Sequence, residues 1–221
     1  MGATMNTVSP KLAEQWKALR SEISSARNGK LPLAGLFLGH IPDGYEKQSK
    51  RVLFVGKATA GEFNEEDASS LSFNGKSSFW QFARQVSRCA GGKSVEPVNV
   101  AWSNVSKIGV AKGNPSKSLQ LAQAALACKT LQDEIETCKP TLVVFVCDGY
   151  GDEIIYEAVN ANRGGANDFE IRHSSHGEFY VRKAIQIGSK QYPAMLWVKH
   201  PQGKSSERRV QWIEEAKKLL V

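Results

Sequence analysis

Short apolar runs alternate with helical stretches along this chain, and the alternation limits the folds that it can adopt. The clearest runs are RVLFVG (51–56), TLVVFVC (141–147) and YPAMLWVKH (192–200). Apolar runs of this length, without polar alternation, are typical of strands buried on both faces. Strands that alternate with helices are joined by crossovers. The pattern therefore predicts a mainly parallel sheet with helices on both faces, which is a three-layer α/β/α sandwich.

The remaining elements follow from residue periodicity. We expect a further strand at 97–105 and a hairpin or sheet edge within 168–188, where polar and apolar residues alternate. Helices are expected at 9–27, 76–90, 116–138, 151–161 and 206–221. Because no repeat or linker divides the chain, we expect one domain over 1–221, in which 1–50 is an N-terminal extension made of a helix and a loop.

Composition indicates the kind of partner and the cellular location to expect. Twenty-nine Lys and Arg against 22 Asp and Glu give a formal charge of +7, which favours an anionic partner, nucleic acid above all. The alternative is that this charge only confers solubility. No apolar run approaches the roughly 20 residues that span a bilayer, and no signal peptide is evident, so we expect a cytoplasmic protein that does not contact membranes.

The ionisable sulfur and imidazole groups give little support for a metal site. The four cysteines form no C-x-x-C pair, which argues against a zinc knuckle or a disulfide framework. His173 and His176 lie close together in HSSH, but two histidines without a third ligand are poor support for a metal. We therefore expect no metal.

In a mainly parallel sheet with helices on both faces, ligands bind beyond the carboxyl ends of the strands. That rule directs attention to four loops. They lie after Gly56, around Asn104, after Cys147 and at His200.

Five segments at or near these loops occur in a recognisable order. They are VLFVGKATAGE (52–62), FNGKSSFWQF (73–82), WSNVSKIG (102–109), ALACKTLQDEIETCKPTLVVFVC (125–147) and WVKHPQG (197–203). Together they resemble the motifs of the uracil-DNA glycosylase superfamily, most of all the branch whose first motif is Gly-Glu-Ala-Pro-Gly. The resemblance implies a uracil-DNA glycosylase-like fold, DNA as the partner and a monomer. It also implies hydrolysis of the N-glycosidic bond of a base flipped out of the DNA stack.

The first motif departs from the family. Thr59 stands where the family has Pro, Ala58 where several branches have Asp or Asn, and Lys57 where this branch has Glu. The cysteines that hold that branch's iron–sulfur cluster are absent, and Ile108 occupies one of their positions, so we expect no cluster and no other cofactor.

These departures place uracil itself in doubt as the substrate. Deaminated purines are one alternative, and the bulky modified pyrimidines of bacteriophage genomes are another. In the second case Ala58 and Ala60 would widen the pocket, and the enzyme would serve antiphage defence.

The resemblance assigns roles to three side chains. Phe73 would stack on the base, Asn104 would read its edge through an amide that both donates and accepts, and His200 would stabilise the departing base anion. Each has a plainer alternative: a core Phe, a turn or cap Asn, and a structural His.

Glu62 is the candidate for the carboxylate that orients water or stabilises the oxocarbenium-like centre at C1′. The alternative is a helix start enriched in acids. Other carboxylates that could replace it are Glu65, Glu66, Asp67, Asp43 and Asp148.

The first motif also supplies the pocket backbone. Gly56 allows close approach to the ligand, and Lys57, Ala58 and Thr59 are expected to line the substrate site. Lys57 has two interpretations, a contact to phosphate or a Schiff-base nucleophile that would add lyase activity.

A further set of residues is expected to hold the DNA backbone. Lys107 closes the Asn-Val-x-Lys segment, and the loop after His200 precedes a helix start where backbone amides bind phosphates. The loop residues are Gln202, Gly203, Lys204 and Ser205.

Two other function classes stay open. The first is a nucleic-acid-binding module that has this fold without the chemistry, which Ala58 favours. The second is an enzyme acting on a free nucleotide or nucleoside, for which the +7 charge is a poor match.

Overall fold

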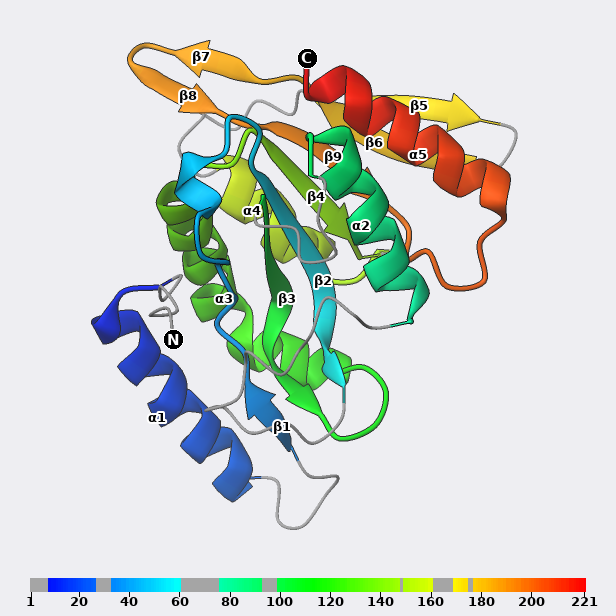
Figure 1. The fold of residues 1–221 in the computed structure, drawn as a ribbon. Coiled ribbons are helices and arrows are strands. Elements are labelled where there is room, and N and C mark those ends of the chain that lie inside the picture. Colours follow the sequence, from blue (N-terminus) through cyan, green and yellow to red (C-terminus); the bar gives the residue numbers. More distant parts are fainter. Residues whose placement is uncertain are drawn as a thin grey trace.

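A seven-stranded sheet lies at the centre of the computed structural model, which describes residues 8–26, 33–60, 76–92, 99–147, 149–160, 169–174 and 177–221 (Figure 1). The helices are α1 (Pro10–Ala26), η1 (Tyr45–Lys47), α2 (Ser78–Cys89), α3 (Lys117–Cys138), α4 (Asp152–Asn160) and α5 (Ser206–Leu219). The strands are β1 (Leu33–Leu36), β2 (Val52–Ala60), β3 (Val100–Val110), β4 (Leu142–Val146), β5 (Glu170–Ser174), β6 (Gly177–Arg182), β7 (Ile185–Ile187), β8 (Lys190–Tyr192) and β9 (Ala194–Val198).

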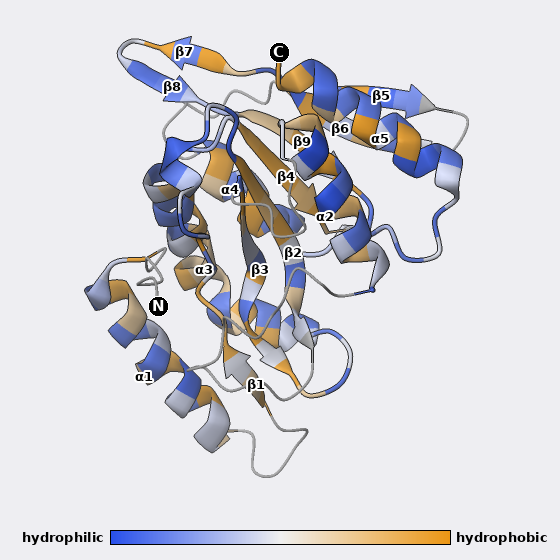
Figure 2. Ribbon diagram, viewed as in Figure 1, coloured by the Kyte–Doolittle hydropathy of each residue, from blue (hydrophilic) through white to orange (hydrophobic). Residues whose placement is uncertain are grey.

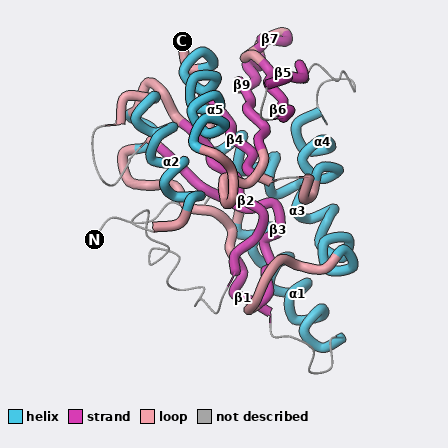
Figure 3. Tube along the Cα trace, turned by 90° about the vertical axis from the view of Figure 1, so that its right-hand side faces the viewer, coloured by secondary structure: helices cyan, strands magenta, loops and turns pink. Residues whose placement is uncertain are grey.

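The sheet confirms the predicted fold class. Its strand order is β1-β3-β2-β4-β9-β6-β5, and the four central strands β3, β2, β4 and β9 run parallel. β1 and β6 pair antiparallel to their neighbours, and β7 with β8 forms a separate hairpin. The view in Figure 3 shows the sheet edge-on between two helical layers, with α2 and α5 on one side and α1, α3 and α4 on the other.

Strand β4 shows why the apolar runs become central strands. All five of its side chains are buried, because both faces are covered. Val143 and Phe145 pack towards α3 and α4, while Val144 and Val146 pack with α2 and α5. The hydropathy colouring in Figure 2 accordingly shows β4 as apolar along its length.

The N-terminal stretch is more closely built into the fold than the predicted extension. The expected loop contains strand β1, which pairs with β3 and extends the sheet, and the short helix η1. On α1, the Trp16 side chain is fully buried and its Nε1 donates to Thr130 Oγ1 of α3 at 2.7 Å. A Gly within the four-residue LAGL explains why the sequence pattern missed β1.

Two of the four predicted loops are strand. β2 continues past Gly56 to Ala60, and β3 continues through Asn104 to Val110, with Gly56 opposite Asn104 in the parallel register. The backbone N–H and C=O groups of the two extensions pair with each other. Both strands can therefore continue beyond their apolar runs. The segments after β4 and β9, at Cys147 and His200, do leave the sheet there, as predicted.

Among the described residues, no helix is both long and apolar enough to cross a membrane.

Lys139 ends α3 in a left-handed conformation, with φ 43° and ψ 54°. Among the described residues it is the only non-glycine with a positive φ. A side chain in this region crowds its own backbone, which costs about 1 kcal/mol. The Lys139 carbonyl accepts a hydrogen bond from Arg51 Nε at 3.0 Å, which helps to hold the strained residue.

We therefore expect Lys139→Gly to raise the free energy of unfolding by about 0.5–1 kcal/mol, because glycine adopts this φ without strain. Urea unfolding followed by circular dichroism measures it. Lys139→Ala is the control, since it removes the same charge but keeps the Cβ. A glycine variant no more stable than the alanine variant would contradict the strain argument.

Candidate functional site

Three of the segments expected to form the site meet around the ring of Phe79, at the start of α2. A Cβ placed on Gly56 of β2 would lie 3.1 Å from Phe79 Cε2 and 2.7 Å from the side-chain amide of Asn104 on β3. The Phe79 ring also stacks on His200, which follows β9, with ring centroids 6.2 Å apart and planes inclined by 16°. Gly56, Asn104 and His200 thus lie together at the carboxyl side of the parallel strands.

The Asn104 amide is held by its neighbours. In the orientation that pairs every group, its oxygen accepts from Thr59 Oγ1 at 2.9 Å and from the Thr59 backbone N–H at 3.2 Å, and its nitrogen donates to the Ser103 carbonyl at 3.0 Å. The opposite orientation would place the amide oxygen against that carbonyl. Because a primary amide has two N–H groups, one donor is left for a ligand while the oxygen is fully engaged.

His200 is half-buried, and its Nδ1 accepts from the backbone N–H of Gln202 at 3.3 Å. A neutral imidazole that accepts at Nδ1 carries its proton on Nε2. The His200 side chain therefore carries its N–H at Nε2.

Aromatic rings continue from Phe79 across the α2 face of the sheet. The Phe79 ring packs edge-on against Trp80 at 4.8 Å, Trp80 packs edge-on against Trp102 at 5.5 Å, and Trp102 stacks on His40 at 4.0 Å. Burial lowers the pKa of His40 and outweighs the raising effect of Asp43, so this ring is neutral at pH 7. Sequence reasoning missed His40 because it lies in a segment expected to be loop, and it assigned Phe79 only to the core.

The other first-motif residues lie along β2. Lys57, Ala58 and Thr59 follow Gly56 directly in β2. Lys57 and Ala58 are half-buried, and Thr59 is buried. Cys147, at the end of β4, is fully buried, and its thiol donates to the Val55 and Gly56 carbonyls at 3.7 Å. Burial raises the pKa of this thiol far above its usual range and so favours its protonated form.

Several predicted residues fall outside the part of the chain that the structure describes. These are Glu62, Phe73, His176 and four of the alternative acids, namely Glu65, Glu66, Asp67 and Asp148. Their roles stay predictions. Asp43 is described and exposed, and it lies close enough to His40 to influence the pKa of that residue.

The prediction that Lys107 binds DNA is wrong. Its side chain is 0% exposed and faces α3, where Nζ contacts both carboxylate oxygens of Glu134 at 2.7 and 2.8 Å and also Ser103 Oγ. Burial is the largest influence on both groups. It lowers the pKa of Lys107 and raises that of Glu134, against the opposing attraction between them. Because β3 continues as strand, Lys107 points into the core and not towards solvent.

The loop after His200 remains available to a ligand. Gln202, Gly203 and Ser205 are exposed and Lys204 is half-buried. Ser205 caps α5 by accepting from the Arg208 backbone N–H at 3.3 Å. This turn lies directly beside His200, which is compatible with the predicted contact to DNA.

In the described ranges, no three His, Cys, Asp or Glu side chains come together as metal ligands. No protein-family model matches the chain, and no curated protein matches it. The assignment of chemistry therefore depends on the motifs and on the geometry around Phe79.

Thr59 sets the donor pattern of Asn104, and this can be tested directly. We expect Thr59→Val to weaken the hold on the Asn104 carbonyl by removing the hydroxyl donor at nearly constant volume. Thr59→Ser is the matched control, because it keeps that donor. Side-chain amide NMR should show faster hydrogen exchange at Asn104 in the valine variant alone, and equal exchange rates in both variants would contradict the assigned orientation.

The buried Lys107–Glu134 pair makes a second prediction. Glu134→Gln should lower the free energy of unfolding by roughly 3–5 kcal/mol, because it leaves a buried ammonium without its counter-charge. The double variant Lys107→Met/Glu134→Leu should recover most of that loss. Chemical denaturation of the variants measures both effects.

The control for this comparison is Glu153→Gln, which breaks the exposed Lys117–Glu153 pair. It should change stability by less than about 0.5 kcal/mol. A double variant no more stable than Glu134→Gln would contradict the argument that the loss comes from the unpaired buried ammonium.

Proposed function

We propose that this protein is a DNA glycosylase, which hydrolyses the N-glycosidic bond of an altered or modified base flipped out of the DNA stack. One observation carries the proposal. Asn104 on β3 and His200, which follows β9, each carry an N–H group near the Phe79 ring at the carboxyl side of the parallel sheet.

Such a site suits the departure of a base. As the glycosidic bond breaks, negative charge develops on the oxygens and nitrogens of the base, and fixed N–H donors stabilise that charge. Asn104 Nδ2 and His200 Nε2 would supply the two donors. The neighbouring face of Phe79 is an apolar surface against which an extruded base could stack.

The sugar develops positive charge in the reaction and is stabilised by a negatively charged group. The oxocarbenium-like centre at C1′ is stabilised by a carboxylate, which also orients water. We assign this role to Glu62, which follows β2 in the sequence by two residues. Ala58 supplies no carboxylate, so the acid has to come from beyond the strand.

The donor pattern also favours one class of base. Because Thr59 occupies the Asn104 oxygen, the amide does not accept from a ring N–H such as those of uracil and hypoxanthine. A cytosine-type base presents an acceptor at N3 in place of that N–H. A donor left unpaired in the pocket costs about 1–3 kcal/mol, so a modified cytosine of the kind found in bacteriophage genomes fits better than uracil. This preference supports an antiphage role within the same proposal.

Recognition of DNA would use the formal charge of +7 and the loop from Gln202 to Ser205. Binding should then weaken steeply with salt, because each phosphate contact releases counterions.

The decisive experiment incubates the protein with oligonucleotides that carry uracil, hypoxanthine, 5-hydroxymethyluracil or 5-hydroxymethylcytosine, then cleaves abasic sites with alkali. We expect product from the modified cytosine. His200→Ala should slow the reaction by roughly 10²–10³-fold, as loss of one donor to a developing anion does. His173→Ala is the matched control, since His173 is exposed on β5, away from this cluster.

Three outcomes would contradict parts of the proposal. Salt-dependent DNA binding without an abasic product from any base would indicate a binding module without chemistry. Cleavage of uracil DNA alone would refute the proposed base preference. A covalent adduct after borohydride treatment would replace hydrolysis by Schiff-base chemistry, with Lys57 as the candidate amine.

A further inference from the structure

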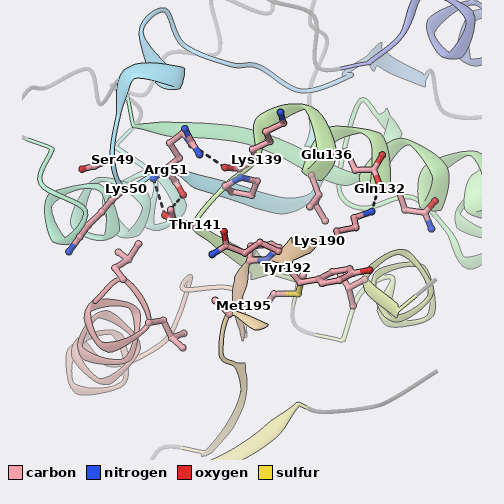
Figure 4. Close-up of a pocket in the computed structure, with 18 of the residues that line it drawn as sticks. Ser49, Lys50, Arg51, Gln132, Glu136, Lys139, Thr141, Lys190, Tyr192 and Met195 are labelled. Carbon is pink, nitrogen blue, oxygen red and sulfur yellow. Dashed lines mark hydrogen bonds and ion pairs between the residues drawn. The ribbon is translucent and has the colours of Figure 1, made fainter. Parts of the chain in front are cut away.

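A cavity lies at the amino ends of the parallel strands, on the opposite side of the sheet from the cluster around Phe79. Its volume is about 810 Å³, within the range of small-molecule sites. The ends of α3, α4 and α5 and the β7–β8 hairpin surround it, and residues just before β2 and β4 complete it (Figure 4).

One part of the cavity is apolar. Met195 at the start of β9 and Val159 on α4 are buried, and Tyr192 contributes an aromatic ring. Ile135 of α3 and Leu220 after α5 enlarge this surface. It would accept a compact hydrocarbon or aromatic body.

The polar part is basic. Among the described lining residues, the basic side chains are Lys50, Arg51, Lys139 and Lys190, and the one acidic side chain is Glu136. Glu136 is already neutralised, because its carboxylate pairs with Lys190 Nζ at 2.7 Å. Lys50, Arg51 and Lys139 therefore leave an excess of positive charge at the cavity.

Arg51 is held in position before any ligand arrives. Its Nε donates to the Lys139 carbonyl at 3.0 Å and its Nη1 to the Glu46 carbonyl at 3.3 Å. A guanidinium has five N–H groups, so these two bonds fix the group and leave further donors. The Lys139 backbone that accepts one bond is the strained left-handed residue at the end of α3. Figure 4 shows Arg51 and Lys139 joined on the same side of the cavity, with Thr141 beside them.

We propose that this cavity binds a small amphipathic anion, with an apolar body against Met195 and Tyr192 and one carboxylate or similar group at Arg51, where the positive charge of Lys50 and Lys139 adds to the attraction. The site is separate from the cluster around Phe79, so the proposal is independent of the proposed glycosylase activity.

The test uses three probes that share one apolar body and differ in charge: naphthylacetate, naphthylethanol and naphthylethylamine. Isothermal titration calorimetry of the full chain should show naphthylacetate binding roughly tenfold more tightly than the alcohol, because its anionic group gains charge-assisted hydrogen bonds. The amine should bind most weakly.

The double variant Lys50→Gln/Lys139→Gly removes two of the cations, and glycine suits the backbone at position 139. It should lower the affinity for naphthylacetate by roughly tenfold and leave that for naphthylethanol unchanged. The matched control is Lys17→Gln/Lys112→Gln, which removes the same charge from exposed positions outside the cavity lining. Equal affinity for all three probes, absence of naphthylacetate binding, or an equal loss in both double variants would overturn the proposal.

Discussion

The ion pair between Lys107 of β3 and Glu134 of α3 determines how the sheet meets the helical layer behind it. A buried charge is tolerated only with its partner in place, so the helix has to lie where Glu134 reaches Lys107 and Ser103. Successive strand residues face opposite sides. With Ser103 directed towards α3, Asn104 faces α2, Phe79 and His200. The contact of Ser103 and Lys107 with Glu134 on the α3 face of the sheet is therefore consistent with the Asn104 amide lying on the α2 face.

Much of the fold could be predicted because buried apolar runs report local burial on both faces. The lengths of β2 and β3 could not be predicted in this way. The segments GKATA and SKIGV contain small or polar residues, and they are strands because each pairs with the other. That pairing is non-local, so no window of sequence reveals it. The same holds for β1, whose four residues form a strand through β3.

The residues of the candidate site also divide into those that the sequence singled out and those that it missed or misplaced. The rule that ligands bind beyond parallel strand ends singled out Asn104 and His200, but Asn104 lies within β3 and only His200 follows a strand end. Lys107 was misplaced because a lysine in a polar-looking segment suggests exposure, and its burial depends on a partner 27 residues away. Phe79 gave no signal that distinguished it from a core residue, and nothing around His40 suggested its stacking on Trp102.

The burial of Cys147 affects how the protein resists oxidation and alkylation. Its sulfur lies beneath Gly56, shielded from solvent, and burial keeps it in the thiol form. Cys138 and Cys128 are also buried, and burial raises the pKa of the Cys128 thiol to about 11. Oxidants and alkylating agents react with the thiolate, so these sulfurs resist both. The strand ends beneath the cluster around Phe79 should therefore keep their shape under peroxide or electrophile stress that inactivates enzymes with exposed, acidic thiols.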